Sequence, residues 1–470
     1  MTLEKFLLMR NELLIIAGIL LILLADLILD KEKHKTNAFS LVIIALIAAA
    51  GFIPQGEGSL FGGMYVTDLL RVVMKTILNI AVFVVFLQAS SWLLKEDNRS
   101  KLAEFYILVL AALAGMSYMI SSANFLMLYL GLELATLPVA GLAAFDQFKS
   151  KSAEAGIKMI LSSAFASGML LFGLSILYGT TGSVDFAKLS ASFTGDSLSA
   201  FGFILFFSGM AFKISIVPFH LWTADVYEGA PINVTSFLSV VSKGASIFIL
   251  IIVLYHVFGE YPNIWQDIIY LTAILTMTIG NLFALRQNNL KRFLAFSSIA
   301  QAGFIFLGVI SNSSLGMASV LYFIFIYLFS NLGAFGVVSA VSVATGKENI
   351  SDYQGLYRTN PKLSLVMMLS LFSLAGIPPV AGFFGKFFLF TAAAQNSFYV
   401  LVLIGVLNAT LALYYYLLVV KAMFIDKTEN PIPGFQSPLT MRISLVICVF
   451  GIITVGLAGF IFDHLQIISQ

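Results

Sequence analysis

Five lysines of this 470-residue chain lie inside apolar stretches long enough to be membrane helices: Lys75, Lys158, Lys213, Lys243 and Lys386. A charge at the centre of a membrane helix costs about 2.5–3.5 kcal/mol on insertion scales, so such residues usually face the bundle interior or a wet cavity. Burial makes lysine give up its proton more readily, because the charged form loses solvation, and a nearby carboxylate opposes that effect. These residue types therefore indicate proton transfer within a membrane.

Depth singles out four ionisable residues near the middle of their apolar stretches. Glu133 lies about nine residues after the start of one stretch, and Lys243 lies about ten residues after the start of another. Ten residues of helix span ~15 Å, half of a ~30 Å hydrocarbon layer. Lys213 and Lys386 also lie well away from the ends of their stretches. We therefore predict that these four residues form a proton relay bridged by water.

The alternative for any one charge is an inert ion pair that only specifies how helices pack, and a purely structural membrane spacer would contain nothing else. The number of charges favours the relay, because Lys243 and Lys386 lie beside backbone breakers that free polar groups for an ion site. Lys158 follows Glu154 by four residues, a spacing typical of a helical ion pair, so relay and ion pair both stay open there. Lys75 lies near a helix start and is expected to snorkel outward.

An acidic segment separates two of these lysines. We expect Thr223–Ile232 to be a loop; it contains Asp225 and Glu228 but no Lys or Arg. Proton uptake explains this composition better than membrane topology does, and His220, just before the segment, is a minor candidate for the same role. In a later apolar stretch, Ser298 and Gln301 are expected to order water.

Composition places the chain among all-α polytopic membrane proteins. It is 59% hydrophobic and 11% charged, whereas soluble domains carry nearer 25% charged residues. A transmembrane barrel would show ~10-residue alternating segments, which do not occur. One cysteine, Cys448, forms no intrachain disulfide and no CxxC metal or iron–sulfur site, and the sequence has no nucleotide-binding glycine motif. We expect no metal, cofactor or redox centre in this chain, and the net charge of +2 indicates no nucleic-acid partner.

Hydropathy and helix breakers predict about fourteen membrane spans. They lie near 13–29, 38–54, 70–94, 104–121, 124–145, 153–179, 199–222, 233–257, 264–285, 291–311, 315–345, 362–395, 398–425 and 441–463. Proline removes a backbone donor and clashes with the preceding turn. Pro218 therefore predicts a break in the seventh helix, and Pro378 with Pro379 predicts a break in the twelfth.

Charge and spacing also predict orientation and organisation. Lysine and arginine gather in alternate loops, which the positive-inside rule assigns to the cytoplasm, so both termini are expected on the outer side. Lys213 near Pro218 and Lys386 near Pro379 recur five spans apart, which indicates two inverted five-helix repeats. The expected divisions are 1–103 with helices one to three, 104–257 with helices four to eight, 258–425 with helices nine to thirteen, and 426–470 with helix fourteen.

Three long motifs carry a family resemblance. They are KISIVPFHLWTADVYEGAP followed by SFLSVVSK, which together run from Lys213 to Lys243, then NNLKRFLAFSSIAQAG (Asn288–Gly303) and SLAGIPPVAGFFGKFFLF (Ser373–Phe390). Over nearly its whole length the chain resembles the proton-antiporter-like membrane subunits of respiratory complex I, and its first span is similar to that of the N-type subunits of bacterial NADH-quinone oxidoreductases. Subunits of multisubunit cation/proton antiporters and related membrane-bound hydrogenases remain alternatives, because they share the core motifs.

The resemblance implies a Glu133–Lys213 pair that leads to a central Lys243 and then to Lys386. It implies outward proton movement in a bacterial inner membrane, coupled to quinone reduction elsewhere in the complex. NADH, flavin, iron–sulfur clusters and quinone would be bound by partner subunits. The direct partners would be a neighbouring antiporter-like subunit and small membrane subunits, with the peripheral redox arm acting indirectly. The sequence departs from the family at Gln301, where many relatives carry histidine, so the path there is expected to pass through water.

Overall fold

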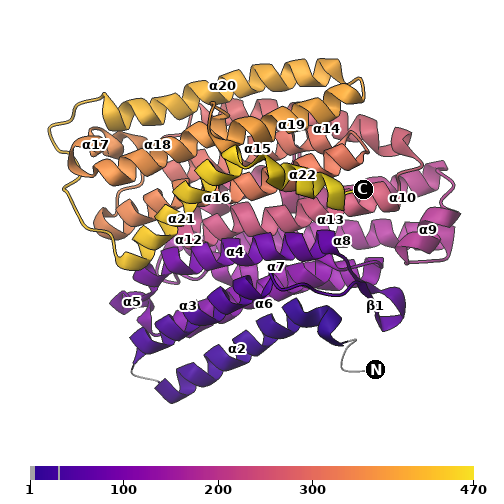
Figure 1. The fold of residues 1–470 in the computed structure, drawn as a ribbon, viewed down its shortest axis with the longest axis horizontal. Coiled ribbons are helices and arrows are strands. Elements are labelled where there is room, and N and C mark those ends of the chain that lie inside the picture. Colours follow the sequence, from indigo (N-terminus) through magenta and orange to yellow (C-terminus); the bar gives the residue numbers. More distant parts are fainter. Residues whose placement is uncertain (1–5, 30–31) are drawn as a thin grey trace. The chain divides into compact units, whose positions relative to one another are not determined.

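The computed structural model of the chain describes residues 6–29 and 32–470, and the described part is helical nearly throughout (Figure 1). It divides into two compact units. Unit 1 contains the described residues up to Phe86 together with Leu93–Ser215 and Val241–Ile268. Unit 2 contains Leu87–Trp92, Ile216–Val240 and Ile269–Gln470. The boundaries of the predicted inverted repeats stay a prediction.

Unit 1 holds the N-terminal elements and one helix from the middle of the chain. In order they are η1 (Leu7–Met9), α2 (Arg10–Leu29), α3 (Lys33–Ala50), β1 (Gly58–Leu60), η2 (Phe61–Gly63), β2 (Tyr65–Thr67), most of α4 (Leu69–Leu93), α5 (Glu96–Arg99), α6 (Leu102–Ile120), α7 (Phe125–Ala143), α8 (Ser150–Thr181), α9 (Phe186–Ser192), α10 (Ser197–Ile214), α13 (Lys243–His256) and the start of α14 (Pro262–Ala284). Strands β1 and β2 form an antiparallel hairpin that pairs Gly58 with Thr67, a small addition to the all-α prediction.

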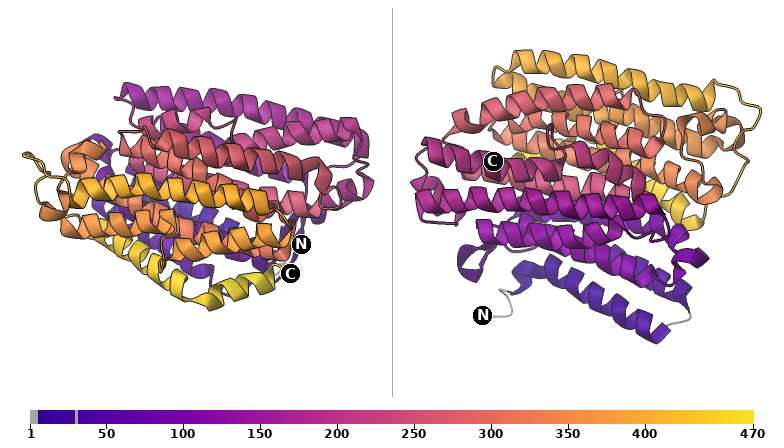
Figure 2. Two further views of the ribbon diagram at one scale, coloured as in Figure 1. Left: turned by 90° about the horizontal axis from the view of Figure 1, so that it is seen from above. Right: turned by 180° about the vertical axis from the view of Figure 1, so that it is seen from behind.

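Unit 2 holds the remaining elements. They are α11 (Leu221–Gly229), α12 (Ile232–Phe237), the rest of α14, α15 (Leu290–Val309), α16 (Ser314–Thr345), η4 (Ile350–Tyr353), α17 (Leu356–Thr359), α18 (Pro361–Ala375), α19 (Ala381–Gln395), α20 (Tyr399–Phe424), α21 (Leu439–Leu457) and α22 (Gly459–Ile468). Helix α16 is buried along most of its length and packs against α15, α18, α19, α21 and α22. Helix α20 runs beside α18 and α19 (Figures 1 and 2).

The prediction of an all-α polytopic membrane protein is confirmed. Within the described residues, twelve helices are long and apolar enough to cross a membrane. Two of the predicted spans do not meet that standard: the span near 38–54, which is α3, and the span near 362–395, which is divided into α18 and α19. The count of fourteen therefore stays a prediction.

Both predicted helix breaks are confirmed. Helix α10 ends at Ile214 before a cis Val217–Pro218 bond, and α18 ends at Ala375 before a cis Pro378–Pro379 bond. A third interruption was not predicted: a π-helical segment, Leu238–Ser242, separates α12 from α13. No proline or glycine marks this position, so the sequence pattern gave no signal for it.

The expected loop Thr223–Ile232 is wrong in its first part, because α11 covers Leu221–Gly229. No helix breaker occurs from Leu221 to Glu228, and the helix packs against α15. The acidic side chains were taken as a sign of a loop, whereas they are three residues apart and share one helix face.

Glycines let α6 and α7 approach closely in unit 1. A Cβ atom added to Gly131 would lie 2.6 Å from the Met119 backbone nitrogen, closer than real Cβ atoms come. On the same helix, a Cβ added to Gly141 would meet nothing within 4 Å. Small residues at such crossings permit the backbone contact that stabilises helix pairs in membranes.

We predict that Gly131→Val lowers the thermal stability of the protein, because the added methyl groups push α7 away from α6. Overpacking of this kind costs about 1–3 kcal/mol. The loss of helical circular dichroism on heating in detergent measures the effect. Gly141→Val is the matched control and should leave the melting temperature unchanged, so equal shifts in the two variants would contradict the close-packing argument.

Candidate functional site

Lys213 and Glu133 lie close together in unit 1, each held by a hydroxyl group. Lys213 is 9% exposed, and its Nζ donates to Thr136 Oγ1 on α7 at 2.5 Å. Glu133 lies one turn earlier on α7 and accepts a hydrogen bond from Ser167 on α8. Within residues 6–29 and 32–470, no ion pair of 4.0 Å or less joins Glu133 to Lys213. Glu133 thus lies one turn along α7 from Thr136, the residue whose hydroxyl group binds Lys213.

The break after α10 determines where Lys213 lies. Ser215 has a left-handed backbone with φ of 68°, and the helix ends at Ile214. Lys213 therefore occupies the last turn of a helix, where the negative end of the helix dipole favours a cation. The early end of α10 therefore places Lys213 in the turn whose carbonyl groups have no partner within their own helix.

Lys243 begins α13 directly after the π-helical segment, and it is 3% exposed. It belongs to unit 1, whereas Ser239 of the π-helical segment belongs to unit 2. Short π-helical segments within α-helices occur frequently at functional sites. The sequence singled out this lysine by its depth, by neighbouring backbone breakers and by the motif that it ends, but it did not predict the π-helical segment.

Lys386 lies in α19 of unit 2, and the broken helix provides its hydrogen-bond partners. Its Nζ donates to the carbonyl oxygens of Leu374 and Ala375 at 2.9 and 3.0 Å. These are the last carbonyls of α18, which have no partner within their own helix. The ammonium also lies 4.5 Å from the centre of the Phe304 ring. The interruption predicted from proline thus creates a polar pocket for a lysine that is 4% exposed.

Gln301 shares one of these partners with Lys386. Its Nε2 donates to the Leu374 carbonyl oxygen at 2.9 Å and to Tyr416 Oη at 3.2 Å. Tyr416 Oη in turn lies 2.5 Å from Ser297 Oγ. Protein groups therefore bind the amide nitrogen of Gln301, whose side chain was expected to order water. Its oxygen Oε1 is buried and has no hydrogen-bond partner in the described part of the chain, so it is the atom suited to accept from a water.

Arg292 explains the acidic segment. Its Nη1 donates to Asp225 Oδ1 at 2.7 Å and to Glu228 Oε2 at 3.0 Å, so the cation missing from the segment is supplied by α15. Sequence reasoning missed this partner, because it lies more than sixty residues away along the chain. The acidity of the segment therefore no longer argues for proton uptake.

Among the other accessory candidates, Lys158 and Ser298 have ordinary partners, whereas the buried Nδ1 of His220 has no hydrogen-bond partner in the described part of the chain. Lys158 forms an ion pair with Glu154 at 2.7 Å, and the two side chains are 40% and 60% exposed, which favours the ion-pair alternative. Ser298 Oγ donates to the Ala295 carbonyl oxygen within α15. His220 is buried at the start of α11. Among residues 6–29 and 32–470, no group of three or more His, Cys, Asp or Glu side chains is arranged to hold a metal ion.

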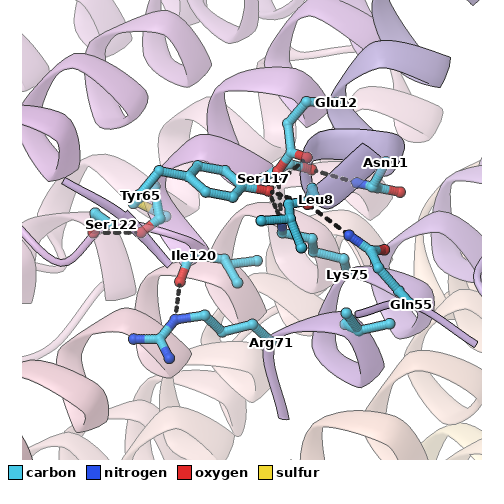
Figure 3. Close-up of polar contacts among 12 residues, drawn as sticks. Leu8, Asn11, Glu12, Gln55, Tyr65, Arg71, Lys75, Ser117, Ile120 and Ser122 are labelled. Carbon is cyan, nitrogen blue, oxygen red and sulfur yellow. Dashed lines mark hydrogen bonds and ion pairs between the residues drawn. The ribbon is translucent and has the colours of Figure 1, made fainter. Parts of the chain in front are cut away.

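The expectation that Lys75 snorkels outward is wrong. Its side chain is 3% exposed, and its Nζ lies 2.5 Å from Glu12 Oε1 (Figure 3). Glu12 itself is fully buried. Neither the depth nor the motif argument singled out Glu12, because it lies at the start of the first span, where a carboxylate usually faces the surface.

A family model and a relative of known name both connect this chain with NADH:quinone oxidoreductases. A family described as NADH:quinone oxidoreductase/Mrp antiporter, TM, matches residues 122–412. The chain is 50% identical over 460 residues to a Phocaeicola vulgatus protein named NADH-quinone oxidoreductase subunit N, and the match covers 97% of each chain.

Solved structures give the same fold. A chain of respiratory complex I from Thermus thermophilus with bound aureothin superposes with a TM-score of 0.82 at 27% identity, over 96% of this chain and 98% of that one. A chain of the Mrp complex from Dietzia sp. superposes with a TM-score of 0.85 at 20% identity, over 100% of this chain and 97% of that one. The second likeness concerns the fold alone.

We predict that Arg292→Gln lowers the melting temperature, because it leaves two carboxylates facing each other without their cation. All three side chains are partly exposed, so the loss should be no more than about 1 kcal/mol. Replacing Asp225 by Asn and Glu228 by Gln in the same variant removes the repulsion and should restore stability. If the triple variant is no more stable than Arg292→Gln, the pairing does not account for the acidic segment.

Proposed function

Since the chain belongs to the NADH:quinone oxidoreductase/Mrp antiporter family, we propose that it is a proton-translocating subunit of the membrane arm of an NADH:quinone oxidoreductase. It is a multi-pass protein of a bacterial inner membrane and works within a multisubunit complex. The named relative at 50% identity supports the redox assembly, and the complex I likeness supports the same placement.

The observation that carries the proposal is the burial of three lysines inside apolar helices, each beside an interrupted helix: Lys213, Lys243 and Lys386. A permanently charged group gains nothing from such a position, whereas a group that alternates between ammonium and amine needs a desolvated site. In unit 1, Glu133 favours the ammonium form of Lys213 when the two approach, and Lys243 takes the proton next. In unit 2, Lys386 carries the proton, and the Leu374 and Ala375 carbonyls stabilise its ammonium form.

The remaining parts of the proposal concern the surroundings of the chain. Both termini face the outer side, in accordance with the distribution of lysine and arginine. Other subunits bind NADH, flavin, iron–sulfur clusters and quinone. Electron transfer in those subunits drives proton movement through the lysines of this chain. The direct neighbours are another antiporter-like subunit and small membrane subunits.

A cation/proton antiporter assembly is the second candidate, and the likeness to the Mrp chain is the observation in its favour. That likeness shows the fold alone, so the two assemblies are distinguished by purification. Flavin and iron–sulfur subunits that co-purify with this chain support the oxidoreductase. Sodium-dependent proton exchange without NADH supports the antiporter.

We predict that Lys243→Ala lowers quinone-coupled proton uptake in inverted membrane vesicles, because a relay loses its central proton carrier. NADH oxidation and assembly of the complex serve as readouts that a folding defect would change. Lys188→Ala is the control, since Lys188 is an exposed lysine paired with Asp185. Normal proton uptake in an assembled Lys243→Ala complex would rule out the relay.

Thr136→Val is predicted to slow proton uptake as well. The substitution removes the acceptor of the buried Lys213 ammonium, and leaving such a group without a partner costs about 1–3 kcal/mol. Thr136→Ser keeps the hydroxyl group and should behave like the unmodified protein. Equal rates for the valine and serine variants would show that the hydroxyl has no part in the function.

A further inference from the structure

A second group of buried ionisable side chains lies in unit 1, outside the relay (Figure 3). Glu12 of α2 and Tyr65 of β2 are 0% exposed, and Lys75 of α4 is 3% exposed. Lys75 Nζ lies 2.5 Å from Glu12 Oε1 and donates to Tyr65 Oη at 3.1 Å. Three elements that are distant in sequence therefore bring a carboxylate, an amine and a phenol into mutual contact.

Tyr65 connects the other two groups without ionising. Burial, followed by the adjacent Glu12 carboxylate, raises the pKa of Tyr65, which lies before the membrane span of α4. Its hydroxyl group lies 3.0 Å from Glu12 Oε2 and 3.2 Å from the Leu8 carbonyl oxygen. The phenol thus remains a hydrogen-bond donor and leaves Glu12 and Lys75 as the two groups that exchange a proton.

A small cavity adjoins Lys75. Its volume is about 10 Å³, which is the size that holds one water molecule. The polar residues that line it are Arg10, Asn11, Gln55, Lys75 and Thr76. Arg10 and Gln55 also make hydrogen bonds at the exposed surface of the unit, to Pro54 and Leu7 carbonyl oxygens. Water at this position would contact the amine and the surface polar groups together.

Polar groups continue inward from the same cavity. Asn79 Nδ2 donates to Asn11 Oδ1 at 2.7 Å, and Asn11 Nδ2 donates to Ser117 Oγ at 3.0 Å. The Asn79 side chain is fully buried, and its Oδ1 has no hydrogen-bond partner in the described part of the chain. Buried acceptors are normally satisfied by protein or water, so this atom marks a second position for an ordered water. The Glu12–Lys75 pair therefore has polar groups on two sides.

Other ionisable groups lie around the Glu12–Lys75 pair. Arg71 pairs with Asp68, and its Nε donates to the Ile120 carbonyl oxygen. The other ionisable groups that face the cluster or its Arg71–Asp68 pair are Arg10, Tyr118 and His256. His256 ends α13, the helix that Lys243 begins. Helix α13 therefore runs ~20 Å from the central lysine of unit 1 toward the end of the unit that holds this cluster.

We propose that Glu12 and Lys75 form a proton-release site on the side of the membrane where α2 begins, and this rests on the proposed relay through Lys243. A proton arriving from the interior of unit 1 forms an O–H bond on Glu12, which neutralises the carboxylate and weakens its hold on Lys75. The Lys75 ammonium then breaks one N–H bond and passes its proton to the cavity water, which carries it to the surface. Transfer of the proton from Glu12 to the neutral amine restores the pair, so one proton arrives and one leaves.

An inert ion pair that anchors α2 makes a different prediction. Removing one partner of a buried pair leaves a lone charge and damages either kind of site, so single variants do not discriminate. Removing both charges leaves the packing nearly intact. The charge-free double variant Glu12→Gln/Lys75→Met is therefore the informative one.

The experiment measures the proton-to-electron ratio of the assembled complex in inverted vesicles driven by NADH. We expect Glu12→Gln/Lys75→Met to assemble, to oxidise NADH, and to lower the ratio to the value found with Lys243→Ala. Combining it with Lys243→Ala should cause no further loss, because the two changes affect one route. Asp26→Asn/Lys33→Met is the matched control: it removes an ion pair that joins α2 to α3, 2.8 Å long and partly exposed, and should leave the ratio unchanged.

The outcomes separate the two proposals. A normal ratio in the double variant together with a lowered ratio in Lys243→Ala overturns the release site and leaves the relay standing. A normal ratio in Lys243→Ala overturns the relay itself. If the double variant does not assemble, Glu12→Asp with native Lys75 provides the second measurement. It keeps both charges and shortens the carboxylate, so a lowered ratio with normal NADH oxidation supports proton release and a normal ratio opposes it.

Discussion

The cost of placing a charge in an apolar interior governs this structure. Each deeply buried lysine whose partners are described above has a specific polar group at its amine: Thr136 for Lys213, two freed carbonyls for Lys386, and a carboxylate with a phenol for Lys75. Without such partners, the ammonium form of each would be strongly disfavoured. The helix interruptions follow from the same constraint, because an intact helix keeps its carbonyls for itself.

The two units meet this constraint differently. In unit 1, Lys213 lies in the last turn of α10, where hydroxyl groups from α7 and α8 hold the lysine and the nearby Glu133. In unit 2, Lys386 lies after the break and uses backbone oxygens of α18. A hydroxyl group both donates and accepts, whereas a carbonyl oxygen only accepts. In the proposed relay, the first arrangement suits transfer of a proton, and the second suits stabilisation of the ammonium form.

Each unit contains a buried side-chain oxygen that has no hydrogen-bond partner in the described part of the chain. In unit 2, Gln301 shares the Leu374 carbonyl oxygen with Lys386, and its Oε1 has no protein partner. In unit 1, the unpartnered Oδ1 belongs to Asn79, which binds Asn11, a residue that lines the cavity beside Lys75. Each is suited to an ordered water, and water is the medium through which amides take part in proton transfer. The neutral Gln301 is thus compatible with a proton route, since its amide nitrogen fixes its position through Leu374 and Tyr416 while its oxygen stays available.

The sequence by itself determined the membrane class, both proline-linked helix breaks and the burial of Lys213, Lys243 and Lys386, because hydropathy and proline geometry act within a few turns of chain. Tertiary structure alone decided the partners. Arg292 reaches Asp225 from a separate helix, and Lys75 meets Glu12 across sixty-three residues, so neither local spacing nor composition indicated these contacts. A charge in an apolar interior requires a partner, and only packing decides which distant residue provides it.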